Sequence, residues 1–391
     1  MAEVNVVMLG GKRVGKSTIL AAIIDAFNNS TELSSYLVCK DTTPYEKYSG
    51  HTIDEKRESL KQLVKQRLDG SLFMTQTMAD SKIQKYSISV RLPERPGQLT
   101  IDFYDVPGEF ANPAKLEFSS EMVPLIAQCD VFVIAIDTPY LMEAPKSVNR
   151  AYNRVGDLEV ALQNIICNDD NDIKQILLVP VKCEKWVAGG KLSEVIDKIK
   201  SEYKVLIETM SAYPGMNVSI LPIETVGGIH FHSFYDAKIL AKDGKPLSFA
   251  CRPSTGNKVH LANGNEFELI APFHMDNDKQ SIVDGVSIPH AWYHKIQKAR
   301  YAPRNCEQPA LHILRFLVKK TALYQRSIKE DSGIGGFFRG LWNGVSNWWK
   351  GLEYGTFSTT IATMEEKGLI KDNCDGAELL HRCKRWEDAV C

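Results

Sequence analysis

Hydrophobic residues follow two alternating periods over residues 1–230 of the chain. Short β-branched or alternating runs predict strands at 4–9, 84–92, 99–104, 130–136, 175–181 and 218–224. Apolar residues three and four positions apart predict helices at 17–27, 54–68, 115–128, 147–166 and 192–209. Strands that alternate with helices of this length are typical of parallel βαβ units. The pattern therefore predicts an α/β fold, a three-layer sandwich with a mostly parallel sheet that includes one hairpin.

The pattern changes near residue 230, where the helical spacing gives way to β-like runs. Asp243-Gly244-Lys245 and Asn263-Gly264-Asn265 each separate two such runs, which favours two hairpins. We therefore expect a β-rich insertion at 231–305 that follows a core at 1–230. Helical spacing then returns, and the segment 306–330 is expected to close the sheet as its last helix.

Residues 331–391 form the last predicted unit, an aromatic helical tail. Within it, residues 337–352 (FFRGLWNGVSNWWKGL) place apolar side chains at helical spacing and hold three of the six tryptophans. Three interpretations are open for this stripe: packing on the globular core, docking in a partner's groove, or lying at a membrane surface. Packing is favoured, and membrane contact is not, because the stripe carries only two basic residues.

Composition narrows the class of protein without pointing to a partner. The 391 residues are 44% hydrophobic and 24% charged, typical of a globular protein of about two domains, which excludes collagen, disorder or coiled coil throughout. Lys and Arg number 47 against 48 Asp and Glu, so the overall charge gives no reason to expect a nucleic-acid partner. Nine cysteines without a C-x-x-C pair, and no signal-like apolar start, favour a reducing, cytoplasmic location.

One loop matches a phosphate-binding pattern in full. Gly10–Ser17 (GGKRVGKS) fits G-x-x-x-x-G-K-[ST], after a predicted buried strand and at the start of a helix. Its glycines let successive N–H groups curl around a phosphate, Lys16 reaches the β- and γ-phosphates, and the Ser17 hydroxyl ligates Mg²⁺. The expected phosphate-binding residues are Gly11, Lys12, Arg13, Val14, Gly15, Lys16, Ser17 and Thr18.

A second segment follows the predicted strand 99–104. Asp105-Val106-Pro107-Gly108 places an acid at the tip of that strand, where it can hold Mg²⁺ through water. The N–H of Gly108 is placed to bind a γ-phosphate. An Asp-Pro-Gly turn is common by itself, so the order and the spacing after the phosphate loop carry this assignment.

Two later segments have the chemistry to bind a base. Lys182 and Glu184 follow the strand 175–181; the carboxylate of Glu184 can accept the N1–H and N2–H₂ of guanine, which adenine does not present. The stem of Lys182 can lie over the base. Thr225 and Val226 follow the strand 218–224, where a backbone N–H can reach guanine O6.

These four segments, in this order and at these strand ends, resemble the translation-factor-like and Ras-like branch of P-loop GTPases. The resemblance covers residues 1–230 and the helix at 307–329, and within the branch it is to bacterial regulatory GTPase modules. The chain departs from the guanine motif N/T-K-x-D at Val181 and Glu184. It also has Thr225-Val226-Gly227 where the family has Ser-Ala-Lys.

The resemblance implies further roles. Thr77, which precedes the strand 84–92, takes the place of the switch threonine that ligates Mg²⁺, with Thr75 as the alternative. Glu109 stands where many relatives have the glutamine that orients the attacking water, so Glu109, Lys16 and Gly108 are the expected catalytic residues. A glutamate adds negative charge beside the γ-phosphate, which implies slow turnover.

The sequence thus favours a Mg²⁺-dependent enzyme that binds GTP and GDP, hydrolyses GTP slowly and acts as a regulatory switch on a protein effector. Two other functions stay open. The departures at Val181 and Glu184 allow an ATP-hydrolysing enzyme or a nucleotide-dependent kinase. Glu109 and the altered motifs also allow a module that binds nucleotide without hydrolysing it.

Overall fold

The computed structural model of the chain describes most of residues 2–382. The described residues are 2–12, 14–45, 52–65, 83–95, 98–107, 124–125, 128–166, 173–213, 215–235, 258–260, 266–270, 281–283, 285–296, 299–330, 354–373 and 376–382. The expected helix at 115–128 lies almost wholly outside them, and the aromatic stripe at 337–352 lies entirely outside them.

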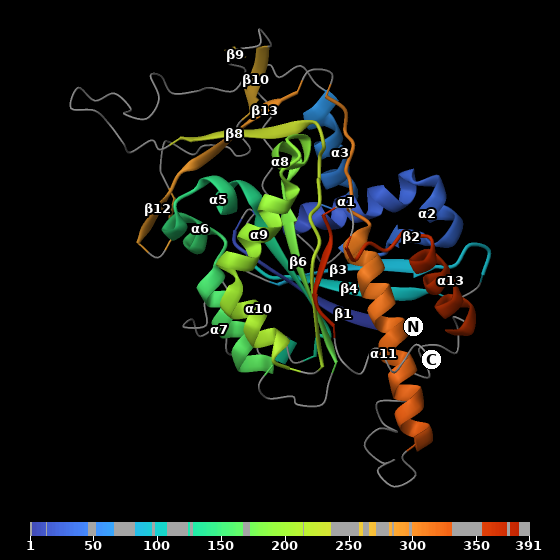
Figure 1. The fold of residues 1–391 in the computed structure, drawn as a ribbon. Coiled ribbons are helices and arrows are strands. Elements are labelled where there is room, and N and C mark those ends of the chain that lie inside the picture. Colours follow the sequence, from blue (N-terminus) through green and yellow to red (C-terminus); the bar gives the residue numbers. More distant parts are fainter. Residues whose placement is uncertain are drawn as a thin grey trace, which may run out of the picture.

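An eight-stranded mixed sheet, in the order β14-β7-β6-β5-β1-β4-β3-β2, forms the centre of the molecule (Figure 1). Its strands are β1 (Ala2–Leu9), β2 (Val38–Asp41), β3 (Gln84–Arg91), β4 (Leu99–Asp105), β5 (Val131–Asp137), β6 (Lys174–Val181), β7 (Met216–Ile220) and β14 (Glu378–His381). The five central strands, from β7 to β4, run parallel, whereas β3 is antiparallel to β4 and β14 to β7. The expected α/β fold with a mostly parallel sheet and a β3–β4 hairpin is confirmed.

Helices cover both faces of this sheet. Figure 1 shows α5 (Thr138–Glu143), α6 (Lys146–Tyr152), α7 (Val155–Ile166), α9 (Leu192–Glu202) and α10 (Lys204–Ser211) on one side. The other side carries α1 (Lys16–Asn29), α2 (Thr31–Tyr36), α11 (Gln308–Glu330) and α13 (Tyr354–Glu366). Two further helices, α3 (Ile53–Lys65) and α8 (Glu184–Ala188), pack on α1 and near the strand β8, respectively.

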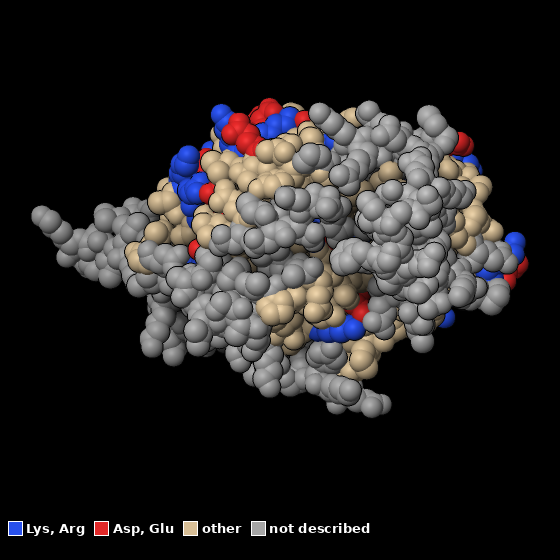
Figure 2. Space-filling model, turned by 90° about the horizontal axis from the view of Figure 1, so that it is seen from below, with Lys and Arg blue, Asp and Glu red and all other residues tan. Residues whose placement is uncertain are grey.

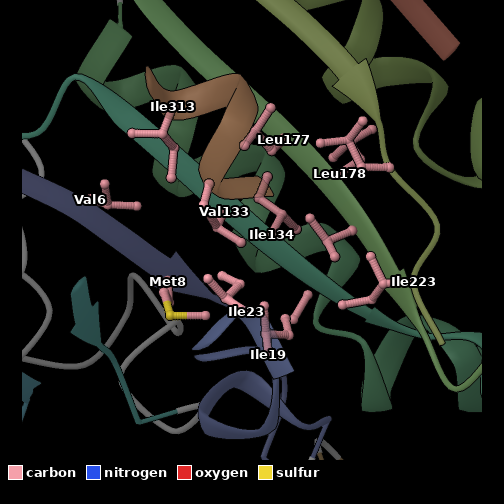
Figure 3. Close-up of a cluster of buried hydrophobic side chains, with 14 of the residues drawn as sticks. Val6, Met8, Ile19, Ile23, Val133, Ile134, Leu177, Leu178, Ile223 and Ile313 are labelled. Carbon is pink, nitrogen blue, oxygen red and sulfur yellow. The ribbon is translucent and has the colours of Figure 1, made fainter. Parts of the chain in front are cut away.

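The apolar core joins the sheet to α1 and α11. Met8, Val133 and Leu177 lie in register across β1, β5 and β6 and are almost completely buried. Figure 3 shows them beside Ile23 of α1 and Ile313 of α11. β1, β5 and β6 are mainly apolar on both faces, as expected where helices cover a parallel sheet from both sides.

Residues 229–295 contain a second, smaller sheet, here called the accessory sheet. It has the order β8-β13-β10-β9, and its strands are β8 (Ile229–Tyr235), β9 (Lys258–His260), β10 (Glu266–Ile270) and β13 (His290–Lys295). A short hairpin, β11 (Ser281–Val283) and β12 (Val286–Ile288), precedes β13. β9 and β10 pair antiparallel on either side of Asn263-Gly264-Asn265, as predicted, whereas Asp243-Gly244-Lys245 lies outside the described residues.

Several elements differ from the sequence prediction. The helix expected at 147–166 is two helices, α6 and α7, because Arg154 adopts a left-handed φ of 57° between them. The helix expected at 192–209 is also divided, at Tyr203 between α9 and α10, and the strand expected at 218–224 ends at Ile220. The short elements α2, β2, α5 and α8 were not expected. The predicted tail is not only helical, because β14 adds a strand to the main sheet.

The C-terminal part of the chain packs as a component of the core. Phe357, Ile361 and Met364 of α13 are at most 1% exposed. Arg315 of α11 donates hydrogen bonds to both carboxylate oxygens of Asp372, at 2.7 and 2.8 Å, which fixes the segment that leads to β14. These residues therefore bind the end of the described chain to the sheet.

The described surface shows mixed charge. On the face in Figure 2, the blue lysine and arginine residues lie beside red aspartate and glutamate residues, mostly near the rim. In the part of the chain that the structure describes, no helix has the length and apolar character needed to cross a bilayer.

The burial of α13 yields a stability prediction. Phe357→Ala is expected to lower the free energy of unfolding by about 3–5 kcal/mol, because a fully buried phenyl ring is lost and a cavity remains. Ala362→Ser, at an exposed position of the same helix, is the matched control and is expected to change it by about 0.5 kcal/mol or less. Denaturant titration measures both. Equal stability of the two variants would contradict a structural role for α13.

Candidate functional site

The candidate site lies at the carboxyl ends of the central strands. β1 pairs with β4 on one side and with β5 on the other. The chain connections to these two neighbouring strands therefore lie on opposite sides of β1. In open α/β sheets such a point is the usual ligand-binding position. It brings together the loop after β1, Asp105 at the end of β4, Asp137 at the end of β5 and Lys182 after β6.

The loop after β1 follows a path that only glycine allows at its start. Gly10 has a φ of 141°, and a Cβ atom on it would lie 2.6 Å from the carbonyl oxygen of Ala135 on β5. At the far end of the loop, Gly15 is the left-handed residue before α1, with a φ of 114°. Gly15 has no side chain to cap the helix, and the first turn of α1 carries no acidic residue. The N–H groups of that turn therefore keep the partial positive charge that attracts anions.

Lys16 connects this loop with Asp105. Its Nζ donates hydrogen bonds to the carbonyl oxygens of Gly10 at 3.4 Å and Gly11 at 3.3 Å, and lies 3.7 Å from Asp105 Oδ1. Burial lowers the pKa of Lys16, and the charge of Asp105 opposes this effect. Burial likewise raises the pKa of Asp105, against the nearby charges of Lys16 and Lys56.

Lys56 is a residue of the site that sequence reasoning did not single out. It lies on α3, and burial lowers its pKa, an effect that Asp105 opposes and Lys182 reinforces. Its helix is held on α1 by Asp25, a fully buried residue whose carboxylate lies 3.1 Å from Arg57 Nε and 3.3 Å from Lys61 Nζ. The sequence predicted this helix but not which of its lysines comes near Asp105.

Asp137, which is fully buried, and Lys182, which is partly exposed, form an ion pair between the ends of β5 and β6. Lys182 has a left-handed φ of 60°, and its side chain returns to Asp137. Asn153 supports the pair, because its side chain accepts a hydrogen bond from the Asp137 N–H at 2.8 Å and donates one to the Asp137 carbonyl at 3.2 Å. Asp137 also caps α5, a role that the sequence analysis missed although the run Asp137-Thr138-Pro139 after a buried strand is a signal that could have indicated it.

Glu184 joins two loops that the sequence assigned to one base. It starts α8 and is only 3% exposed. Its Oε1 accepts hydrogen bonds from the backbone N–H groups of Val226 at 3.1 Å and Gly227 at 3.3 Å. Burial raises the pKa of Glu184, and these two donors oppose that effect. Thr225 lies buried in the same loop.

The segment 299–304 packs against the loop that contains Val226. Gly227 has a φ of 83°, and a Cβ atom there would lie 2.4 Å from the carbonyl oxygen of Ala302, so glycine is required. Glu224 pairs with Arg304 through the backbone and through its side chain, with Arg304 Nε 3.3 Å from Glu224 Oε1. Burial and the negative charge of Glu184 raise the pKa of Glu224 to about 7, against the pull of Arg304.

Two threonines that precede α3, Thr43 and Thr52, have structural tasks. Thr43 binds the sheet edge, because its hydroxyl donates to Asp41 at 2.6 Å and accepts from the Ser87 N–H at 3.0 Å. Thr52 and Glu55 form a reciprocal capping pair at the start of α3. Four of the predicted site residues lie outside the described part of the chain: Arg13, Thr77, Gly108 and Glu109.

The described residues contain no group of three or more His, Cys, Asp or Glu side chains that suits a metal ion. Mg²⁺ in phosphate sites needs only one or two carboxylates, with water and phosphate oxygens completing its shell. Ser17 and Asp105 supply oxygen ligands of that kind.

Cys39, Cys129, Cys183 and Cys306 are buried free thiols.

Comparison with known proteins does not assign the chain to a family. No family model matches the sequence, and no curated protein is significantly similar to it. The functional interpretation therefore depends on the motifs and on the geometry of the residues above.

The raised pKa of Glu224 yields a pH prediction. Between about 4.3, the usual value for glutamate, and about 7, folded Glu224 keeps a proton that the unfolded chain has lost. The folded state is therefore destabilised relative to the unfolded chain as pH rises through this range. Glu224→Gln, which is neutral at every pH, is expected to match the wild-type melting temperature near pH 5 and to exceed it near pH 8.

Melting temperatures at several pH values test this expectation. Glu208→Gln, an exposed position on α10, is the control and should follow the wild-type profile. Parallel profiles of wild type and Glu224→Gln between pH 5 and pH 8 would show that Glu224 ionises in its ordinary range.

Proposed function

We propose that the protein is a Mg²⁺-dependent P-loop GTPase that binds GTP and GDP, hydrolyses GTP slowly and acts as a regulatory switch on a protein effector. The observation that carries the proposal is the position of Lys16. Its ammonium group lies between the carbonyls of a glycine loop and the acid that ends the neighbouring strand. That edge of the sheet also holds the buried contact between Glu184 and the loop of Val226.

Lys16 and the first turn of α1 supply the phosphate chemistry. The buried ammonium is a point charge for the β- and γ-phosphates, and α1 adds N–H donors at its uncapped end. Ser17 and Asp105 are the described residues that would hold Mg²⁺, which supplies further charge neutralisation for the phosphates. Lys56 adds a second ammonium group near Asp105.

Glu184 supplies the base chemistry. A carboxylate has about four acceptor sites, so two backbone donors leave capacity for the N1–H and N2–H₂ of guanine. Lys182 lies next to it, with its stem available to cover the base. In this proposal Glu109 orients the attacking water and Thr77 contacts the γ-phosphate.

A measurement of phosphate release in a single turnover distinguishes a slow GTPase from a module that binds nucleotide without hydrolysing it.

The first test removes the central charge. Lys16→Ala is expected to weaken GTP binding in the presence of Mg²⁺ by about 100-fold or more, because charge-assisted bonds to two phosphates are lost. Calorimetric titration measures the affinity, and circular dichroism should show an unchanged fold. Lys204→Ala, at an exposed position on α10, is the control. Unchanged GTP affinity in Lys16→Ala would refute nucleotide binding at this loop.

The second test concerns the base. Glu184→Gln keeps one acceptor oxygen for the N–H groups of Val226 and Gly227 but replaces the other oxygen by a donor. GTP affinity is expected to fall by about 10- to 100-fold, since guanine donors lose their acceptor, while ATP affinity stays the same.

Glu143→Gln, an exposed glutamate on α5, removes the same charge and serves as the control. Equal losses for GTP and ATP in Glu184→Gln would mean that Glu184 supports the loop without recognising the base.

A further inference from the structure

Aromatic side chains join the accessory sheet to the ends of β5 and β6. Tyr140 of α5 stacks on Tyr152 of α6, with ring centroids 3.7 Å apart, and lies 4.7 Å from the ring of Phe234 on β8. The Tyr140 hydroxyl donates a hydrogen bond to the carbonyl of Pro289, next to β13, at 2.6 Å. These contacts hold the accessory sheet against the end of the main sheet where the candidate site lies.

Tyr293 of β13 reaches from the accessory sheet to Lys182. Its ring centroid lies 5.9 Å from Lys182 Nζ, and its ring meets that of Phe231 edge to face at 5.9 Å. The pairing of β13 with β8 shifts register between Trp292 and Tyr293. The extra residue at this shift is His232 of β8, and irregularities of this kind are frequent next to functional sites.

The hydroxyl of Tyr293 is buried without a partner. The residue is 6% exposed, and its Oη makes no hydrogen bond within the described parts of the chain. An unpaired hydroxyl in the interior is unfavourable, so it calls for an explanation such as a ligand. Burial, with the charges of Asp137 and Glu184, raises the pKa of Tyr293 well above its usual value. The group is therefore a neutral hydroxyl that can donate and accept.

We propose that Tyr293 contacts the nucleoside part of the bound nucleotide and is a specificity-determining residue contributed by the accessory sheet. The inference rests on the proposed nucleotide site. It deepens that proposal by adding a residue that no motif in the sequence indicates. Tyr293 lies beside Lys182, which is assigned to the base, whereas Lys16 marks the phosphate end. A neutral hydroxyl suits a ribose hydroxyl or the edge of a base.

The test compares wild type and Tyr293→Phe by calorimetric titration with GTP, 2′-deoxy-GTP and tripolyphosphate, each with Mg²⁺. The loss of one hydrogen bond is expected to weaken GTP binding by about tenfold and to leave tripolyphosphate binding unchanged. A loss for GTP but not for 2′-deoxy-GTP assigns the contact to the ribose 2′-hydroxyl. Equal losses for the two nucleotides assign it to another nucleoside atom.

Tyr203→Phe is the matched control. The Tyr203 hydroxyl is also buried and unpaired among the described residues. Of the charged groups that shift its pKa, Arg150 on α6 has the largest effect. This control should bind GTP as wild type does, and nucleotide-free Tyr293→Phe should melt no lower than wild type.

Two results would overturn the role of Tyr293 while leaving the proposed function intact. One is undiminished GTP affinity in Tyr293→Phe, and the other is an equal loss for GTP and tripolyphosphate. Failure of the wild-type protein to bind GTP would instead overturn the nucleotide site itself, and the role of Tyr293 with it.

Discussion

Buried carboxylates, each compensated by a lysine or by backbone N–H groups, hold the loops at the carboxyl edge of the sheet together. Burial raises the pKa of Asp105, Asp137 and Glu184, so each carboxylate is costly to ionise without compensation. Lys16 compensates the first and Lys182 the second, and backbone N–H groups compensate the third. None of these loops can move away without leaving a desolvated charge behind, which makes their relative position a property of the electrostatics as much as of the apolar core.

The sequence was sufficient for the parts of the fold that depend on local pattern. The apolar runs of β1, β5 and β6 are buried on both faces, so their composition alone marks them as central strands. The loop at Gly10 was also predictable, because its backbone path requires a glycine and Lys16 supplies the positive charge of a phosphate-binding motif. The chain order of the strands then placed Asp105 beside that loop.

The remaining features depend on contacts between segments far apart in the chain, which no local pattern encodes. β2 and β14 are four-residue strands that exist only through pairing with β3 and β7. Lys56 was hidden because a helix has several polar faces and only packing on Asp25 decides which one turns inward. Tyr293 was hidden because its approach to Lys182 depends on how the accessory sheet packs against the main sheet.

The pairing of β14 with β7 also bears on how the chain folds during synthesis. The two strands are about 160 residues apart in the sequence, yet β14 covers an edge that β7 would otherwise expose. At the usual rate of about 5–20 residues per second, β7 leaves the ribosome on the order of 10–30 s before its neighbour is made. For that time the edge of β7, with unpaired N–H and C=O groups that pair readily with other chains, stays open to other polypeptides nearby.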